Sequence, residues 1–575
     1  MQRPKRAMDG PPTCEPVKAG KLGGVAKPRF CQADIARGRT LRAMFSSSLP
    51  SPRQALVALG GGLVMATAFP SLDLWPLTLV GLIPLLWLAR ELPPRRAFLA
   101  GWIFGLAMNL ALRYWLTVVM TTYGGVPWPL AILGLVLLEL YLSLYVAAFA
   151  GLTSYLAGRG LSPILCAPFI WAGLEWVRGW AFTGFPWLPL SAGLTSFPVL
   201  LQSAEWWGAT GVSGLVVLVN ALVARALLPG GPRPEPRRRL AAGLVAVILL
   251  ASAGLGGHWR MRQVERAAAQ APHLTVSVVQ ANIPLEELWR PGLRSSVVRR
   301  HLLLTAQAAR KVTERPWLVV WPESAAPFYF LNDARDSLPV LKAARDLGAY
   351  ITLGSQGLIK AGPPLTASNR AWLVGPQGEP LGYYDKVHLV PFGEYVPAPR
   401  VFFFIRAIAA LGIDFKPGGR GDTLRAGDVL LGPLICYESI FPELAQAQRQ
   451  QGAVLMVNQT NDSWYGRTGA AYQHMSHLVL RAVENRVAAA RAANTGVSCF
   501  VLPDGRVEQA TGLFVPAVET RRLPLLTMPT LFTRYGDVAG PLGLAFCLAA
   551  WLGAWISSRR KPKTGGQGQD SPQGR

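Results

Sequence analysis

The sequence predicts a polytopic α-helical membrane domain, with about eight transmembrane helices, joined to an α/β domain. Of the 575 residues, 51% are hydrophobic and only 15% are charged, a lower charged share than that of an average soluble protein. Apolar runs that could cross a bilayer lie on both sides of a less apolar stretch. Within that stretch, from 259 to 535, short β-branched runs alternate with helical patterns, which is typical of α/β layering.

The two ends of the chain carry basic, low-complexity sequence. Residues 1–52 are rich in Arg, Lys, Pro, Gly and Ser and show no periodicity, so we expect a disordered extension. They contain no apolar core followed by a small-residue cleavage site and so do not resemble a signal peptide. We expect residues 559–575 to form a second basic, disordered tail, on the cytoplasmic side.

Seven apolar runs are expected to be transmembrane helices within 53–258, and an eighth within 536–558. The seven lie at about 55–72, 74–89, 97–120, 128–157, 161–177, 207–228 and 240–257. Most are long enough for a hydrocarbon core of ~30 Å, which takes ~20 helical residues. The first two are short and are separated only by Asp73, so we expect them to form a tight helical hairpin.

The loop charges predict the orientation of these spans. Basic residues follow the second, sixth and eighth spans, at Arg90, Arg95, Arg96, Arg225, Arg233, Arg237, Arg238, Arg239, Arg559, Arg560, Lys561 and Lys563. By contrast, 121–127 and 179–205 contain no Lys or Arg. Positive loops stay on the cytoplasmic side, so both termini are expected inside and 259–535 outside. Membrane orientation therefore explains the net charge of +25 better than nucleic-acid binding does.

Four ionisable residues fall in or beside apolar runs, where they are costly and often functional. Glu175 and Arg178 are three residues apart on one helical face and could pair. For Arg113 and Glu139, a structural ion pair is at least as good an interpretation as contact with lipid headgroups.

Neither disulfides nor metal sites are predicted. The six cysteines show no paired spacing. His474 and His477 form an HxxH pair, but no third ligand type lies near them in sequence, so we expect them on a helix surface.

Alternating elements are expected through the α/β domain. Strands are predicted at about 274–280, 317–321, 349–353, 370–374, 380–384, 429–435, 453–457 and 497–502. Helices are predicted at about 293–312, 335–347 and 471–492.

Three reactive side chains follow strand-like runs. A partly desolvated carboxylate at Glu323 suits a general base, and an ammonium at Lys386 could stabilise an oxyanion. Cys436, at a strand-to-helix turn, has the setting of a thiolate nucleophile. Each residue alone is more often a surface acid, a solvated lysine or a buried structural cysteine. Together they supply the groups needed for covalent acyl transfer.

The order and local sequence of these residues resemble a known superfamily. WPES at 321–324, YDKVHLVPFGEYVP at 384–397 and ICYES at 435–439 are similar to the nitrilase superfamily, whose enzymes use a Glu-Lys-Cys triad on an αββα sandwich. The apolar runs, with GWAFTGFPW at 179–187, QANIP at 280–284 and NQTNDSW at 458–464, narrow the resemblance to the apolipoprotein N-acyltransferases. It covers roughly residues 53–557.

The resemblance implies roles for individual residues. Glu323, Lys386 and Cys436 would be the catalytic triad, and Glu394 a second glutamate that positions the lysine and the oxyanion. The further substrate-binding candidates are Trp289, Asn369, Tyr437 and Glu438.

The implied reaction is ping-pong acyl transfer, the last step of bacterial lipoprotein maturation. A fatty acyl chain would pass from the sn-1 position of a phospholipid to the cysteine as a thioester. It would then pass to the α-amino group of the N-terminal diacylglyceryl-cysteine of an apolipoprotein. No cofactor is implied. The expected location is the bacterial inner membrane, with the catalytic domain (259–535) in the periplasm.

Two other functions stay open at this point. A membrane-anchored nitrilase-type amidase acting on a small amide would share the triad, although an anchor needs only one span. A non-catalytic membrane scaffold is the other alternative, and the retention of all three triad residues weighs against it.

Overall fold

The computed structural model describes residues 49–228, 235–362, 365–400 and 414–560. From Pro50 onward the chain forms one compact unit. The predicted N-terminal extension and C-terminal tail lie almost entirely outside the described residues.

Helices occur at every predicted span. They are α2 (Pro52–Ala66), α3 (Ile83–Glu91), α4 (Pro94–Arg113), α6 (Trp128–Ala157), α7 (Pro163–Arg178), α8 (Ala204–Leu227), α9 (Pro236–Gln270) and α17 (Ala539–Arg560). Six of them, α2, α3, α4, α6, α7 and α9, carry proline in the first turn, where the missing N–H costs no intrahelical bond and the fixed φ favours the helix.

Only some of these helices meet the length and composition of a membrane span. Among the described residues α6, α8 and α9 do, and a fourth is added if α4 and Leu116–Tyr123, bent by 56°, count as one span. This continuation consists of α5 (Leu116–Val118) and the π-helix η2 (Val119–Tyr123). Helix α3 has 9 residues, about 14 Å at the helical rise, which is short of a ~30 Å core. The predicted eight spans are therefore not shown.

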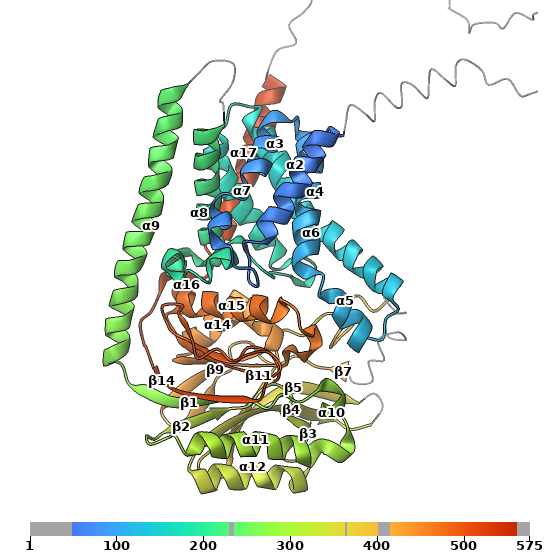
Figure 1. The fold of residues 1–575 in the computed structure, drawn as a ribbon, viewed down its shortest axis with the longest axis vertical. Coiled ribbons are helices and arrows are strands. Elements are labelled where there is room, and N and C mark those ends of the chain that lie inside the picture. Colours follow the sequence, from blue (N-terminus) through green and yellow to red (C-terminus); the bar gives the residue numbers. More distant parts are fainter. Residues whose placement is uncertain (1–48, 229–234, 363–364, 401–413, 561–575) are drawn as a thin grey trace, which may run out of the picture. The chain divides into compact units, whose positions relative to one another are not determined.

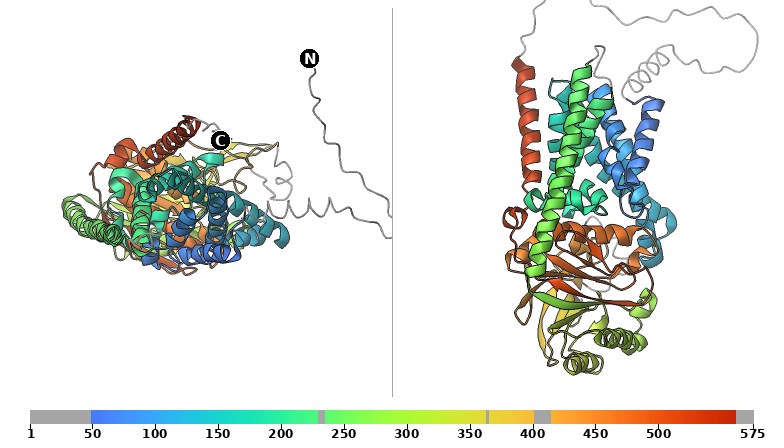
Figure 2. Two further views of the ribbon diagram at one scale, coloured as in Figure 1. Left: turned by 90° about the horizontal axis from the view of Figure 1, so that it is seen from above. Right: turned by 60° about the vertical axis from the view of Figure 1, so that its left-hand side comes forward.

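Helix α9 is much longer than the predicted span at 240–257. Its 35 residues extend about 52 Å, so it passes the end of the bundle and leads into the α/β domain (Figure 2). Its exposed apolar side chains include Leu244, Ile248 and Leu255. An exposed apolar face of this kind, which does not pack against the rest of the protein, suits a lipid environment.

The α/β part contains two sheets. The first has the order β14-β1-β2-β4-β5-β6, with β3 beside β4 and β7 beside β5; the second has the order β13-β12-β11-β10-β9-β8. The first sheet is built from β1 (His273–Gln280), β2 (Trp317–Val320), β3 (Ala326–Tyr329), β4 (Tyr350–Lys360), β5 (Thr366–Val374), β6 (Pro380–Asp385), β7 (Asp414–Phe415) and β14 (Ala517–Pro524). The second is built from β8 (Leu424–Ala426), β9 (Val429–Ile435), β10 (Leu455–Thr460), β11 (Ala488–Ala493), β12 (Cys499–Val501) and β13 (Val507–Glu508).

Helices cover the outer face of each sheet. The first sheet is covered by α11 (Arg294–Ala309) and α12 (Ala334–Leu347), the second by α14 (Pro442–Gln450) and α15 (Ala470–Asn485) (Figure 1). The layers are thus α-β-β-α, and the predicted αββα sandwich is confirmed. Apolar residues of both sheets, among them Val276, Leu318 and Leu431, fill the space between the sheets, and this burial is the main force that holds the sandwich together.

The prediction of a helix through 471–492 is wrong at its C-terminal end. Helix α15 ends at Asn485, and Arg486 takes the left-handed conformation, with a φ of 46°. The following AAARAA run is the buried strand β11, paired in parallel with β10. Its alanines have high helix propensity, but sheet pairing and burial of one face between the sheets override that preference.

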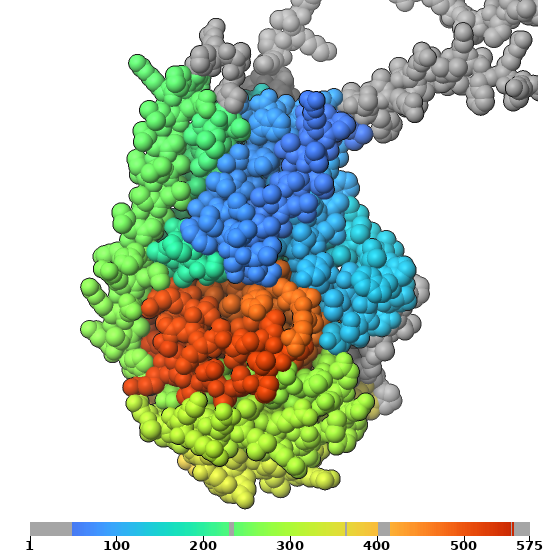
Figure 3. Space-filling view, viewed as in Figure 1, coloured from blue at the N-terminus to red at the C-terminus, as the bar shows by residue number. Residues whose placement is uncertain are grey.

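Helix α15 joins the two parts of the molecule. In the space-filling view the orange-red segments lie between the blue helices and the yellow-green layer (Figure 3). On α15, the Gln473 Oε1 accepts hydrogen bonds from Trp115 Nε1 at 3.1 Å and Trp187 Nε1 at 3.0 Å. Its Nε2 donates to the carbonyl of Leu112 at 3.0 Å. The N-terminal helical part and α15 of the α/β part are therefore joined by buried hydrogen bonds.

Candidate active site

Glu323 lies three residues beyond the end of β2 and is buried between the two sheets. Its Oε1 accepts a hydrogen bond from Asn369 Nδ2 at 2.7 Å, and its Oε2 accepts one from the backbone N–H of Asn461 at 3.0 Å. Gln459 Nε2 donates to the carbonyl of Trp321 at 2.6 Å, which ties the same loop to β10. The carboxyl group is thus fixed by both halves of the sandwich.

Lys386 directly follows β6, and its side chain is 1% exposed. Its Nζ donates to Glu394 Oε1 at 3.0 Å and lies 3.7 Å from Glu323 Oε1. Burial by itself would lower the pKa of Lys386, but the carboxyl groups of Glu394 and Glu323 outweigh burial and raise that pKa. The lysine therefore carries a fixed positive charge.

Asn369 joins the two carboxyl groups that flank the lysine. Its Nδ2 donates to Glu323 Oε1 at 2.7 Å and to Glu394 Oε1 at 2.9 Å. Glu394 Oε2 in turn accepts the backbone N–H of Val390 at 2.7 Å. The predicted second glutamate and the predicted pocket asparagine thus hold the lysine in place rather than standing apart from it.

Cys436 lies at the turn between β9 and the 3-10 helix η7 (Cys436–Ile440), with a φ of 51°. Burial raises the pKa of its thiol, and the charge of Glu323 raises it further, while Lys386 acts in the opposite direction. The thiol is therefore protonated at neutral pH. The structure brings the three predicted residues together from the ends of three strands, close enough for their charges to interact.

Glu438 braces this arrangement. Its Oε1 accepts the Tyr384 hydroxyl at 2.8 Å and the Val387 N–H at 2.6 Å, and its Oε2 accepts the Ile435 N–H at 2.7 Å. These bonds tie the segment that carries Lys386 to the strand that carries Cys436. Burial raises the pKa of Glu438 to about 7. The residue was predicted as a substrate contact, and the structure places its carboxyl group among backbone donors.

The other two binding candidates differ in location. Tyr437 is buried beside the rings of Phe441 and His388, with ring centroids 5.1 and 5.9 Å away. Trp289 follows the short helix α10 (Leu285–Leu288) and is 43% exposed. Within the described residues no hydrogen bond or ring contact joins Trp289 to the cluster of Glu323, Lys386 and Cys436, so the structure does not bring it to these residues.

The surface position predicted for His474 and His477 is wrong. Both are fully buried on α15, because one face of this helix covers a sheet and the other contacts the membrane helices. His477 Nε2 lies 3.2 Å from the backbone N of Leu188, and His474 contacts Asp462 and the carbonyl of Cys436. The sequence offered one sign of this environment, the apolar run Leu478–Leu480 beside the pair.

The ionisable residues of the helical part do form an ion pair, and it joins α4 to α6. Arg113 binds Glu139 through two bonds of 2.9 and 2.7 Å, and both side chains are buried. The structural interpretation of these two residues is confirmed. Glu175 instead accepts from Trp171 Nε1 and the N–H of Leu190, and no ion pair with Arg178 is found among the described residues.

Two protein families match this chain. Residues 61–222 match the apolipoprotein N-acyltransferase N-terminal domain, and residues 275–521 match the carbon-nitrogen hydrolases. A relative from Geobacter metallireducens is 37% identical over 526 residues, with 91% of this chain and 98% of the relative covered. A relative from Brucella melitensis is 33% identical, with coverages of 88% and 97%. Both relatives are named apolipoprotein N-acyltransferase.

Two solved structures each match less than half of the chain. An amidase from Nesterenkonia sp. AN1 is 22% identical, with 45% of this chain and 93% of that chain covered and a TM-score of 0.32. Saccharomyces cerevisiae Nit3, a member of branch 10 of the nitrilase superfamily, is 19% identical, with coverages of 44% and 90% and a TM-score of 0.34.

Proposed function

This chain belongs to the apolipoprotein N-acyltransferase family, and from this premise we propose that it moves a fatty acyl chain from the sn-1 position of a phospholipid to the α-amino group of the N-terminal diacylglyceryl-cysteine of apolipoproteins. The observation that carries the proposal is the buried cluster in which Lys386 lies beside Glu323 and acts electrostatically on Cys436. A thiol, a base and a fixed cation are the groups that covalent acyl transfer requires.

In the first half-reaction, Glu323 takes the thiol proton as the sulfur of Cys436 attacks the ester carbonyl carbon. Lys386 stabilises the oxyanion of the tetrahedral intermediate. The bond from this carbon to the glycerol oxygen then breaks, and Glu323 returns the proton to that oxygen. A lysophospholipid leaves, and the acyl group stays on Cys436 as a thioester.

In the second half-reaction, the neutral α-amine attacks the thioester carbonyl carbon. Glu323 takes one proton from the nitrogen, the carbon–sulfur bond breaks, and the sulfur recovers the proton from Glu323. The products are an amide and the free thiol, so no external proton donor or cofactor is needed. A thioester suits this step because amines attack it readily, while the buried site limits hydrolysis.

The raised pKa of Cys436 supports removal of its proton during the attack rather than beforehand. A thiolate already formed beside Lys386 would need a lowered pKa. Glu323 would therefore act as a general base in both half-reactions.

The proposed location is the bacterial inner membrane, where both lipid substrates reside. Residues 53–258 and 536–558 would hold the protein there, and 259–535 would face the periplasm. The apolar helices α6, α8 and α9 and the bias of basic loops support this placement.

A direct assay tests the proposed function against its alternatives. Purified protein would be supplied with phospholipid and a synthetic diacylated lipopeptide, and the products identified by mass spectrometry. We expect the lipopeptide to gain one acyl chain in amide linkage. Hydrolysis of a small amide without such transfer would indicate an amidase, and no turnover of either substrate would indicate a scaffold.

The orientation can be tested at Arg238, whose side chain is 78% exposed. In a background without Cys14 and Cys31, Arg238→Cys should react only with a membrane-permeable thiol reagent, since this end of α9 is expected in the cytoplasm. Lys311→Cys, at an exposed position in the α/β domain, should also react with an impermeable reagent. The reverse pattern would place the active site on the wrong side for lipoproteins.

Glu394→Ala should slow acyl transfer about 10- to 100-fold, the range expected when a polar support of a reactive group is lost. The substitution removes the acceptor of the Lys386 ammonium, so the effect should fall on kcat rather than on folding. Thermal unfolding and turnover would be measured together. Glu314→Ala, at a surface ion pair with Arg522, is the control. A folded Glu394→Ala protein with full turnover would exclude the assigned role.

A further inference from the structure

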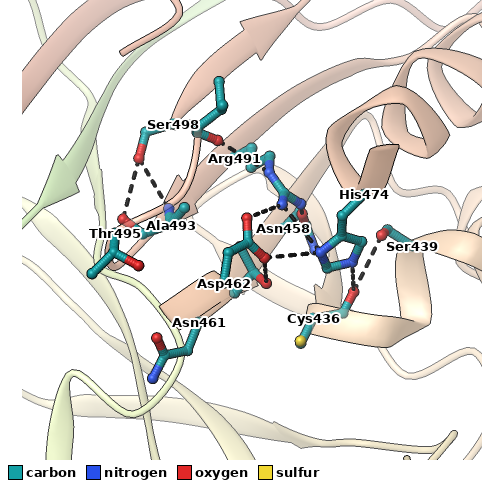
Figure 4. Close-up of polar contacts among 12 residues, drawn as sticks. Cys436, Ser439, Asn458, Asn461, Asp462, His474, Arg491, Ala493, Thr495 and Ser498 are labelled. Atoms are coloured by element: carbon teal, nitrogen blue, oxygen red, sulfur yellow. Dashed lines mark hydrogen bonds and ion pairs between the residues drawn. The ribbon is translucent and has the colours of Figure 1, made fainter. Parts of the chain in front are cut away.

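The backbone carbonyl of Cys436 is held by side chains from two elements (Figure 4). His474 Nε2, from α15, lies 3.0 Å from the carbonyl oxygen, and Ser439 Oγ donates to the same oxygen at 3.2 Å. A carbonyl oxygen only accepts hydrogen bonds, so His474 must carry its proton on Nε2 whatever the charge of the ring. The imidazole is therefore a donor aimed at the nucleophile's own peptide.

The other side of the imidazole is fixed by a buried polar network. Burial, together with the charge of Arg491, lowers the pKa of His474, so the neutral ring with its proton on Nε2 accepts at Nδ1, from Arg491 Nη2 at 3.2 Å. Asp462 Oδ1 lies 2.9 Å from the same nitrogen, and Asp462 Oδ2 accepts from Arg491 Nη2 at 2.8 Å. Burial would raise the pKa of Asp462, but Arg491 and His474 outweigh burial and lower it to about 2. The carboxylate thus holds the Arg491 guanidinium, which in turn donates to the ring.

The peptide between Cys436 and Tyr437 is planar, so its N–H points away from its C=O. Fixing the carbonyl of Cys436 therefore also fixes the direction of the Tyr437 N–H, next to the reactive sulfur. Cys436 has a φ of 51°, a conformation that costs energy for a non-glycine residue and persists only when its surroundings determine it. His474 and Ser439, which donate to the carbonyl of Cys436, are part of the surroundings that determine this conformation.

We propose that His474, held by the Arg491–Asp462 pair, is a positioning residue that orients the Cys436–Tyr437 peptide so that the Tyr437 N–H faces the oxyanion formed when Cys436 attacks. The inference rests on the proposed function, in which Cys436 is the nucleophile. It adds a backbone donor to the stabilisation that Lys386 supplies, and it assigns a purpose to the polar cluster on the far side of the nucleophile.

Two substitutions of His474 separate this role from simple packing. The amide nitrogen of glutamine can reach the place of Nε2 and donate to the Cys436 carbonyl. The amide of asparagine reaches only the place of Nδ1. We expect His474→Asn to load an acyl group from phospholipid about 100-fold more slowly than the unmodified protein, as for the loss of one oxyanion donor. His474→Gln should recover the rate to within about 5-fold.

A second reaction of the same thiol provides the internal reference. Iodoacetamide alkylates sulfur by displacing iodide at a saturated carbon, so no oxyanion forms. Alkylation of Cys436 in His474→Asn should therefore stay within about 3-fold of the unmodified protein. His301 is the control position, since it is buried on α11 and contacts its own helix at Val297. The variants His301→Asn and His301→Gln should load the acyl group at equal rates.

Asp462→Asn tests whether Asp462 helps to hold His474, because the substitution is expected to change alkylation and acyl loading in opposite directions. The charge of Asp462 raises the pKa of Cys436, so its removal alone should speed alkylation. The proposed role predicts that acyl loading nevertheless slows, by about 10-fold.

The inference is overturned if His474→Asn and His474→Gln load at the same rate, if loading and alkylation slow together in His474→Asn, or if Asp462→Asn speeds loading. Failure of the unmodified protein to load an acyl group on Cys436 would instead contradict the proposed function. The two failures are therefore distinguishable.

Discussion

Replacing Cys436 with alanine is expected to abolish acyl transfer, because the covalent route has no other attacking atom. With phospholipid alone, the unmodified protein should accumulate one acyl group on this residue, and the alanine variant none. The adduct should be a thioester, released by neutral hydroxylamine and consumed when the lipopeptide amine is added. Mass spectrometry of peptides that contain residue 436 would locate the group.

Cys499 offers a matched control for this experiment. It is also fully buried in the α/β domain, on strand β12, and burial raises the pKa of its thiol to about 12. Cys499→Ala should load and transfer acyl groups near the unmodified rate. An acyl group found on Cys499, or full turnover by Cys436→Ala, would contradict the proposed mechanism.

Glu323→Gln is expected to slow both half-reactions, by about 10²- to 10⁴-fold, the usual contribution of a general base. The amide cannot take a proton from the thiol or from the incoming amine. Its NH₂ group would also face one of the donors that now bind the carboxyl group, Asn369 Nδ2 or the Asn461 N–H. Local rearrangement would therefore add to the loss.

Two single-turnover measurements separate the roles of Glu323. One follows loading of Cys436 from phospholipid; the other follows attack of the lipopeptide on enzyme loaded beforehand. Both should be slow in Glu323→Gln, and neither in Glu314→Gln, which alters an exposed carboxylate. If only the loading step were slow, Glu323 would serve the thiol alone, and another group would accept the amine proton.

The sequence predicted secondary structure best where the local residue pattern and the packing of the folded protein favour the same element. The apolar run 429–435 became β9 with both bounds unchanged, because a buried strand needs such a run and the turn at Cys436 ends it. Glu323 and Lys386 likewise follow strands that the sequence predicts. Strand ends of two facing sheets meet at one edge, so the cluster follows once the sandwich is recognised.

The remaining features depend on contacts between distant segments. Strand β11 is an alanine-rich run whose local preference is helical, and only its neighbours β10 and β12 decide otherwise. His474 has no local sign of its link to Cys436, 38 residues away. The number of spans is equally non-local, since short helices such as α3 pack against other helices rather than crossing a bilayer unaided.

The contacts of Gln473 mean that the membrane part is not an interchangeable anchor. Cutting the chain at 259 would strip this amide of two indole donors and one carbonyl acceptor. Each buried group left without a partner would cost about 1–3 kcal/mol. The damage would fall on the residue next to His474, in the helix that contacts the carbonyl of Cys436. A catalytic domain excised and grafted onto a foreign transmembrane segment would therefore keep its reactive residues and lose their alignment.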